Sequence, residues 1–369
     1  MSLSSIQDFV EPINLSFLSK DEGYRDTQLG KHIKSYENQL PDIKDADIVL
    51  IGAGECRGAG FALNGFEAAN AVRAALYNLY YWHAQVTIAD LGNVKLGQSI
   101  QDSYAALRTV IAELILQNKK VIIMGGSHDL TLPQYHAYTA IPTLVNAVVA
   151  DAKIDLDLEA RLPSDHFLEE LFTGLPNHLN HYAHIGFQSY FMHPHMLETI
   201  DKLRFDCFRL GVVRESIEEM EPVIRDSHMM SFDISAIQHA QAPANIITSN
   251  GFNGEEACVL MQYAGMSWKT SSIGLFGYQA ELDHHGLTAI QMAQMIWYII
   301  DGVHRGKKEA PLTSLDRFKE FQIAFSDIDT QFLQSKSTGR WWMKLHSGEW
   351  MPCSYKDYLV ASNNEIPER

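Results

Sequence analysis

The feature that most constrains the fold is a regular alternation of short apolar runs with longer stretches of helical periodicity. Eight apolar runs have the length and composition of buried strands. Such alternation is typical of βαβ units that build one parallel sheet covered by helices on both faces. The predicted strands are 47–52, 86–90, 121–125, 147–151, 183–187, 205–210, 228–234 and 272–276.

The segments between these runs include clear helical patterns, and nothing resembling a linker divides the chain. The predicted helices include 67–82, 99–117, 255–264 and 288–302. Across 369 residues there is no Pro/Ser/Gly-rich linker, internal repeat or low-complexity tract. We therefore predict a single α/β domain over 45–310, a three-layer α/β/α sandwich with a mostly parallel sheet of about eight strands. Residues 1–44 form a lead-in, and 311–369 form a C-terminal extension packed on the domain.

Charge and composition exclude several classes of partner and location. With 45 acidic and 29 basic residues the formal charge is −16, so we expect no nucleic-acid partner. No run of 18 apolar residues occurs, and residues 1–10 lack the features of a secretory signal, so we expect a cytoplasmic protein without membrane association. The four cysteines are widely spaced without a C-x-x-C pair, which predicts free thiols.

Residues capable of metal binding or catalysis follow four of the predicted strands. In an open parallel sheet, ligands bind where strands end at their carboxyl edge. Carboxylates and imidazoles are concentrated in segments after such ends, and carboxylate oxygens with an imidazole nitrogen suit Mn²⁺ or another first-row divalent ion. The segments are 125–131, 151–155, 229–235 and 277–289.

Each segment taken alone also has a purely structural explanation. The Gly-Gly-Ser before His128 could be a simple turn into a helix. Asp151, Lys153 and Asp155 could form a self-neutralising ion cluster, because period-2 geometry puts them on one side if the strand continues. Asp233 could simply cap a helix.

Taken in order, the four segments resemble the signatures of the arginase, agmatinase and formiminoglutamase superfamily, the ureohydrolases. The resemblance rests on the Gly-Gly-x-His turn at 125–128, the Asp-Ala-x-x-Asp strand end at 151–155, the Ser-x-Asp strand end at 231–233 and the Asp-x-x-Gly-x-Thr-Ala segment at 283–289. It spans about residues 45–305 and implies an arginase-like fold. The tail is similar to that of a branch labelled formimidoylglutamase or arginase.

The resemblance implies hydrolysis of a C–N bond in a linear amidine or guanidine by two Mn²⁺ ions that share a bridging hydroxide. Carried over residue by residue, the ligands of one ion would be His128, Asp151, Asp155 and Asp233, and all four are present. The substrate class would be formiminoglutamate-like or arginine-like.

The second metal site departs from the family pattern. In the family, one His and one Asp bind only the second ion. In this sequence Lys153 and Ser235 take their places. A protonated ammonium has no lone pair and a serine hydroxyl is a weak ligand, so we expect at most one divalent ion per chain. Lys153 could stand where the second ion stood, because three aspartates would then face one divalent ion and one ammonium. The alternative is no metal, with Lys153 bridging Asp151 and Asp155.

The substrate-binding positions also differ from the family pattern. The family's guanidinium-binding Glu falls at Gly277, and its Asn-Pro falls at Gln279 and Ala280. Glu281 would need a local register shift to replace the missing Glu. The proton-shuttling His has no clear counterpart, although His166 lies near the expected distance after Asp151.

Two functions of different classes follow. The first is a metal-dependent hydrolase with a degraded second metal site, acting on a small-molecule amidine or guanidine. The second is a non-catalytic descendant that keeps the fold for ligand sensing or assembly, since the replacements at Lys153, Ser235 and Gly277 fall together on catalytic positions. Analogy with the family also predicts a homo-oligomer.

Overall fold

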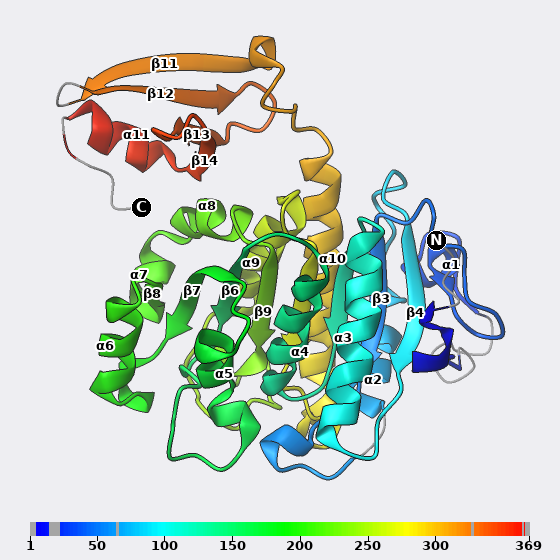
Figure 1. The fold of residues 1–369 in the computed structure, drawn as a ribbon. Coiled ribbons are helices and arrows are strands. Elements are labelled where there is room, and N and C mark those ends of the chain that lie inside the picture. The colour runs from blue at the N-terminus through cyan, green and yellow to red at the C-terminus, as the bar shows by residue number, and fades with distance from the viewer. Residues whose placement is uncertain (1–4, 15–22, 64–65, 326–327, 364, 366–369) are drawn as a thin grey trace.

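Ten strands form the central sheet of the protein, seen in a computed structural model that describes residues 5–14, 23–63, 66–325, 328–363 and 365. The strand order is β1-β4-β3-β5-β10-β9-β6-β7-β8, and β2 pairs with β4 (Figure 1). Every pairing is parallel except that of β1 with β4. The prediction of a mostly parallel sheet within an α/β/α fold is therefore confirmed.

All eight predicted strands are present. In β3, β4, β6, β9 and β10 every residue is buried, so these strands are mainly apolar in sequence and do not alternate between apolar and polar residues. Two short strands that were not predicted, β1 and β2, add to the sheet at β4. The bounds are β1 Val10–Glu11, β2 Lys34–Ser35, β3 Ile48–Ala53, β4 Ile88–Val94, β5 Lys120–Met124, β6 Val145–Ala150, β7 Leu179–Phe187, β8 Asp206–Arg209, β9 Met229–Asp233 and β10 Ser272–Phe276.

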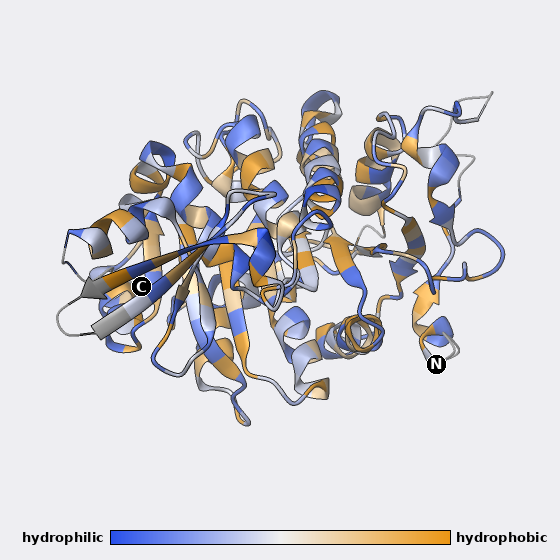
Figure 2. Ribbon diagram, turned by 90° about the horizontal axis from the view of Figure 1, so that it is seen from above, coloured by the Kyte–Doolittle hydropathy of each residue, from blue (hydrophilic) through white to orange (hydrophobic). Residues whose placement is uncertain are grey.

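Helices cover both faces of the sheet. Buried residues of α2, α9 and α10 belong to one core cluster, and those of α3 and α5 to a second cluster. Figure 2 shows hydrophobic and hydrophilic residues interspersed along the helices, as expected of helices that bury one face. The bounds are α1 Leu29–His32, α2 Glu67–Leu76, α3 Ile100–Leu116, α4 Thr131–His136, α5 Phe167–Thr173, α6 Pro194–Lys202, α7 Leu210–Glu215, α8 Met220–Arg225, α9 Gly254–Met266, α10 Leu287–Gly306 and α11 Tyr355–Ser362.

Local signals explain where these helices begin and end. Ser99 and Asn253 form capping boxes at the starts of α3 and α9. The predicted helix 67–82 is shorter in the structure, because α2 ends at Leu76. There Asn78 donates its side-chain amide to the carbonyl of Ala74, a local bond that competes with helix continuation.

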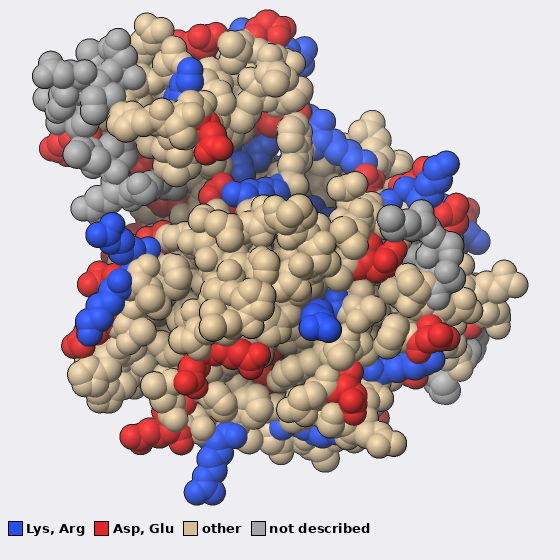
Figure 3. Space-filling model, in the orientation of Figure 1, with Lys and Arg blue, Asp and Glu red and all other residues tan. Residues whose placement is uncertain are grey.

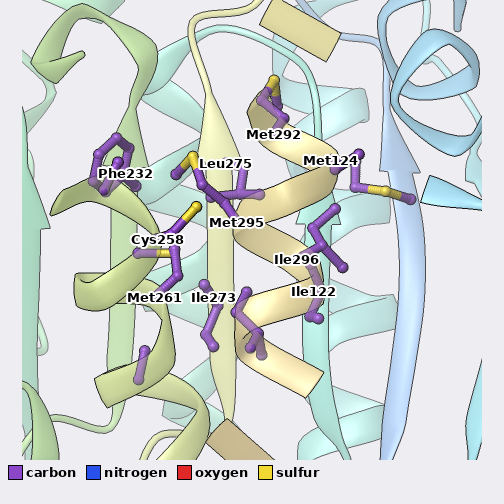
Figure 4. Close-up of a cluster of buried hydrophobic side chains, with 14 of the residues drawn as sticks. Ile122, Met124, Phe232, Cys258, Met261, Ile273, Leu275, Met292, Met295 and Ile296 are labelled. Carbon is purple, nitrogen blue, oxygen red and sulfur yellow. The ribbon is translucent and has the colours of Figure 1, made fainter. Parts of the chain in front are cut away.

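The larger core cluster lies between the sheet and helices α9 and α10. Figure 4 shows Met292, Met295 and Ile296 of α10 and Cys258 and Met261 of α9 directed at strand side chains such as those of β5 and β10. This packing fixes the carboxyl ends of the central strands relative to one another, and the candidate site lies at those ends.

The C-terminal extension is a four-stranded antiparallel sheet with α11 beside it. Its strands are β11 Phe318–Phe325, β12 Ile328–Ser335, β13 Trp341–Lys344 and β14 Trp350–Cys353, in that order. It stands at the end of the domain away from the point of the β9 arrow (Figure 1), and basic side chains gather in the hollow beneath it (Figure 3). The extension is therefore remote from the carboxyl edge.

Buried arginines connect the extension to the domain. The guanidinium of Arg225 donates to the backbone carbonyls of Trp341 (2.8 Å) and Cys353 (3.3 Å). It also lies 4.3 Å from the ring centroid of Trp342, within range of a cation–π contact.

Two further observations bear on the sequence-based expectations. None of the four cysteines forms a disulfide, as predicted, and three of them are buried. Within the described ranges, no helix has the length and apolar character needed to cross a membrane.

Candidate metal centre

The centre lies at the carboxyl edge of the sheet, where β5, β6 and β9 end. After β5 the chain turns through Gly125 and Gly126, whose φ angles of +88° and +82° favour glycine. This turn places His128 at the start of a short 3₁₀ helix, fully inside the protein. Asp233 is the last residue of β9, and Asp151 directly follows β6.

Three carboxylates converge on one nitrogen of His128. Its Nδ1 lies 2.8 Å from Oδ2 of Asp155, 3.0 Å from Oδ2 of Asp151 and 3.8 Å from Oδ2 of Asp233. All four side chains are buried. The four predicted ligands are therefore brought together, although they come from three segments that are widely separated in sequence.

The crowding of carboxylates changes their protonation. Burial and the neighbouring Asp151 raise the pKa of Asp155 to about 8 and that of Asp233 to about 6. Burial alone would lower the pKa of His128, but its hydrogen bonds with Asp151 and Asp155 raise it well above the usual value. Such carboxyl groups repel one another unless a cation or a proton lies between them. The centre is thus electrostatically suited to bind a cation.

A second set of contacts orients the imidazole. Its Nε2 lies 3.2 Å from the hydroxyl of Ser231, which in turn lies 2.6 Å from the hydroxyl of Thr131. Because Nε2 contacts Ser231, Nδ1 faces the carboxylates; in metal sites the free ring nitrogen of a ligating histidine is commonly held by such a hydrogen bond. Sequence reasoning missed Ser231 as a site residue. Its position two residues before Asp233 on β9, hence on the same face, was the available signal.

Ser235 supports the cluster. Its hydroxyl donates to Asp151, and its backbone N–H donates to Asp233 (2.7 Å). Although burial opposes it, hydrogen bonds from His128 and Ser235 hold the pKa of Asp151 well below the usual range. Ser235 therefore orients two of the predicted ligands.

Lys153 does not bridge Asp151 and Asp155, so this predicted contact is not found in the structure. Its Nζ lies 2.7 Å from Oδ1 of Asp165 and 3.9 Å from Oδ1 of Asp155, and its side chain is 29% exposed. The physical reason is that β6 ends at Ala150, so residues 151–155 leave the sheet and do not keep strand alternation. Burial lowers the pKa of Lys153, but Asp155 and Asp165 raise it above the usual value, which keeps this side chain a cation.

Asp165 is a site residue that sequence reasoning missed. It lies in the loop between β6 and α5, and no motif surrounds it; only its place beside His166 drew attention to the segment. Its carboxylate adds a negative charge to the centre. With one divalent ion bound, four carboxylates would face three positive charges, whereas the sequence alone suggested a neutral site.

The cluster forms the floor of a pocket of about 260 Å³. The lining also includes the polar side chains of Ser127, Ser164, Asn245 and Gln279, and the exposed aliphatic side chains of Leu162, Ile246 and Ile247 mark an apolar mouth. The pocket has the mixed character expected of a small-molecule site.

The other predicted site residues lie in different places. Gly277 lines the pocket with φ +79°, and a Cβ at this position would lie 2.3 Å from Asp233 Oδ2. Glu281 is exposed and does not line the pocket, so the proposed register shift does not bring it into the site. His166 is also absent from the pocket lining, where its neighbours Ser164 and Asp165 are found.

The residues present fit one divalent ion. One ligand atom each from His128, Asp151 and Asp155 lies within 4.8 Å of the others, and Asp233 completes the set. Oxygen ligands with a single imidazole suit Mn²⁺. The private donors of a second ion are not found among the residues that the structure describes near this cluster, since Ser235 donates to Asp151 and Lys153 is a cation.

Comparisons with known proteins identify the family and the fold. Residues 46–301 match the model of the Arginase family. The fold is similar to Trypanosoma cruzi formiminoglutamase with Mn²⁺, at 15% identity and TM-score 0.67 over 76% of this chain and 99% of that one. It is also similar to formimidoylglutamase from Bacillus subtilis (16%, TM-score 0.66, 77% and 96% covered). A third similar structure is the agmatine ureohydrolase of Thermoplasma volcanium (18%, TM-score 0.60, 78% and 98% covered). In a sequence comparison with curated proteins, none matches.

Proposed function

The chain belongs to the arginase family, and we propose from this premise that it hydrolyses a C–N bond in a linear amidine or guanidine with one bound Mn²⁺. The observation that carries the proposal is the convergence of three buried carboxylates on Nδ1 of His128 at the floor of a pocket. A buried cluster of this composition is stable only with a cation or protons inside it.

His128, Asp151, Asp155 and Asp233 would hold the ion. When bound there, a divalent ion lowers the pKa of water and so supplies a nucleophile at neutral pH. Hydrogen bonds orient these side chains before an ion binds: His128 contacts Asp151 and Asp155 through Nδ1 and Ser231 through Nε2. Ser235 donates to Asp151 through its hydroxyl and to Asp233 through its backbone N–H.

Asp155 is the best-placed group for proton transfer. Its Oδ2 contacts His128, whereas its Oδ1 faces the rim, 3.9 Å from Nζ of Lys153. We assign it to accept a proton from the attacking water and return that proton to the departing nitrogen. The C–N bond breaks, water supplies the oxygen, and an amine or ammonia leaves.

Lys153 acts as a fixed cation in this scheme. Because Asp155 and Asp165 keep it protonated, it balances charge at the rim and does not serve as a general acid or a ligand. Gln279, which takes the place of the family's Asn, offers a neutral amide to the substrate.

A second function, ligand binding without catalysis, is favoured by a different observation. Gly277 leaves no room for the acidic side chain that binds the guanidinium in the family, because its Cβ would overlap with Asp233. A pocket that retains its metal ligands but lacks this group could bind an amidine without hydrolysing it.

An assay of product release separates the two functions. The purified chain with added MnCl₂ is given formiminoglutamate, arginine and short alkyl amidines, and formamide, urea and ammonia are measured. The hydrolase predicts release above that of a His128→Asn variant at the same Mn²⁺ concentration. Equal rates for the two proteins, with Mn²⁺ bound to the wild type, would favour the non-catalytic function.

A further inference from the structure

The pocket offers no free cation to a substrate carboxylate. Among the described residues that line it, Lys153 is the single Lys or Arg. Its ammonium already contacts two carboxylates, Asp165 at 2.7 Å and Asp155 at 3.9 Å. A substrate whose far end is anionic would therefore find no Lys or Arg among these residues that is not already paired with a carboxylate.

The net charge of the site has the same consequence. Four carboxylates, those of Asp151, Asp155, Asp165 and Asp233, are opposed by Lys153 and one divalent ion, which leaves one negative charge. A substrate with a single positive charge, such as an amidinium or guanidinium, neutralises the site. Because the floor is buried, this difference is weakly screened by solvent.

The mouth of the pocket is apolar. Three large aliphatic side chains that line it remain exposed, Leu162 at 38%, Ile246 at 64% and Ile247 at 43%. They come from two loops, one between β6 and α5 and the other between β9 and α9. Clustered exposed aliphatic residues beside a pocket are typical of a binding surface for an apolar group.

One polar side chain in the wall is available to the charged head of a ligand. Gln279 is buried and lines the pocket, and none of the described residues forms a hydrogen bond with its side-chain amide. Its amide oxygen is an acceptor that suits the N–H groups of an amidinium.

We propose that the pocket selects a monocationic amidine or guanidine with an apolar far end and rejects one whose far end is a carboxylate. The head binds over the metal ligands with Gln279, and the apolar end contacts Leu162, Ile246 and Ile247. The inference rests on the proposed function for the amidine head. It deepens that function by naming the substrate class.

Three guanidines of similar length test the selection. n-Pentylguanidine, agmatine and 4-guanidinobutanoate share the head and end in a methyl, an ammonium and a carboxylate. Their affinities for the full chain with MnCl₂ are measured by calorimetry, and urea release is measured in parallel. The methyl-ended compound is expected to bind at least about tenfold more tightly than the carboxylate-ended one, a ratio that corresponds to about 1.4 kcal/mol.

A charge placed at the mouth should reverse part of this preference. Ile246→Lys adds a cation beside the far end of the ligand and should bring the affinity ratio of the methyl-ended to the carboxylate-ended compound toward one. Val212→Lys is the matched control, because Val212 is 58% exposed and does not line the pocket. It should leave the ratio unchanged.

The outcomes are distinguishable. Tighter binding of the carboxylate-ended compound overturns the inference and leaves the amidine hydrolase standing. Binding in the expected order without urea release supports the inference and argues against hydrolysis. If none of the three binds, both fail. If Ile246→Lys changes the sedimentation mass but not the affinity ratio, the apolar mouth is a contact between copies of the chain, and the inference is overturned.

Discussion

A Cβ atom at Gly277 would lie 2.3 Å from the carboxylate oxygen Oδ2 of Asp233. Gly277, which takes the place of the family's glutamate, is therefore also needed to leave space for Asp233, a candidate metal ligand. Its φ of +79° adds a second reason for glycine. Restoring the glutamate alone would displace Asp233 and would not rebuild a guanidinium site.

We predict that Gly277→Ala destabilises the protein by about 2–4 kcal/mol and weakens Mn²⁺ binding, since it combines backbone strain with a clash. Gly286→Ala is the matched control, because Gly286 has φ +68° and open space around its Cβ position. Gly286→Ala should lower the free energy of unfolding by about 1 kcal/mol, from backbone strain alone. Urea unfolding and Mn²⁺ titration measure both effects. Equal losses in the two variants would show that the contact with Asp233 is unimportant.

The ion pair of Lys153 and Asp165 can be measured with a double-mutant cycle. Lys153→Met is expected to destabilise the fold by about 1–2 kcal/mol, less than for a fully buried pair, because both side chains are about one-third exposed. The coupling with Asp165→Asn should be about 0.5–1.5 kcal/mol. A loss of about 4 kcal/mol for Lys153→Met alone would mean that Lys153 is essential to the buried cluster.

Metal stoichiometry tests the degraded second site. Elemental analysis after dialysis against Mn²⁺ should give at most one ion per chain. The double variant Lys153→His with Ser235→Asp supplies the donors that the family pattern has and should bind a second ion. Ser164→Asp adds a carboxylate to the same pocket wall without completing a ligand shell and serves as the control. Two ions in the wild type would show that the ligand count is wrong.

Eight strands of the central sheet could be predicted from their apolar runs, whereas the short strands β1 and β2 could not. The set of four converging residues followed from the resemblance to the arginase superfamily, and the geometry of a parallel sheet explains why they meet. Buried parallel strands consist mainly of apolar residues, and residues at or just after their carboxyl ends lie at the same edge of the sheet. His128, Asp151 and Asp233 each follow this rule.

The contacts that the sequence could not predict depend on loops. Lys153 points to the rim because β6 ends three residues earlier, and Asp165 joins it from a loop whose path no motif specifies. The predicted alignment of Glu281 and His166 with the site used sequence distance alone, which says nothing about the direction of a loop side chain. The need for glycine at position 277 likewise could not be predicted, because it comes from the close approach of Asp233, which lies on another strand.

The extension should unfold together with the domain. Arg225→Met would remove the donor to the carbonyls of Trp341 and Cys353 and the stacking on Trp342, so a loss of about 2–4 kcal/mol is expected. The exposed Arg214→Met on α7 is the control and should change stability by less than about 1 kcal/mol. Calorimetry of the wild type should show one transition. Two separate transitions would mean that the extension is an independent unit.

His228, at the other end of β9 from the metal centre, is held in its neutral form. Its Nδ1 accepts a hydrogen bond from the backbone N–H of Asn146 at 2.9 Å, so a proton on that nitrogen would break the bond. Burial, with a smaller contribution from Lys269, lowers the pKa of His228 to about 4.

The lowered pKa of His228 predicts that the protein becomes less stable in acid. Between the unfolded pKa of about 6.5 and the folded value near 4, the unfolded chain binds a proton that the native chain does not, so stability falls as the pH falls. The loss attributable to His228 should reach at most about 3 kcal/mol at pH 4 and be absent above about pH 7. His228→Gln should be less stable than the wild type at pH 7, but its free energy of unfolding should change less between pH 7 and 4. His195→Gln, at an exposed site, should show the same pH dependence of stability as the wild type. Urea unfolding at stepwise pH measures each slope. Parallel curves for wild type and His228→Gln would refute the assignment, since the titrating group would then lie elsewhere.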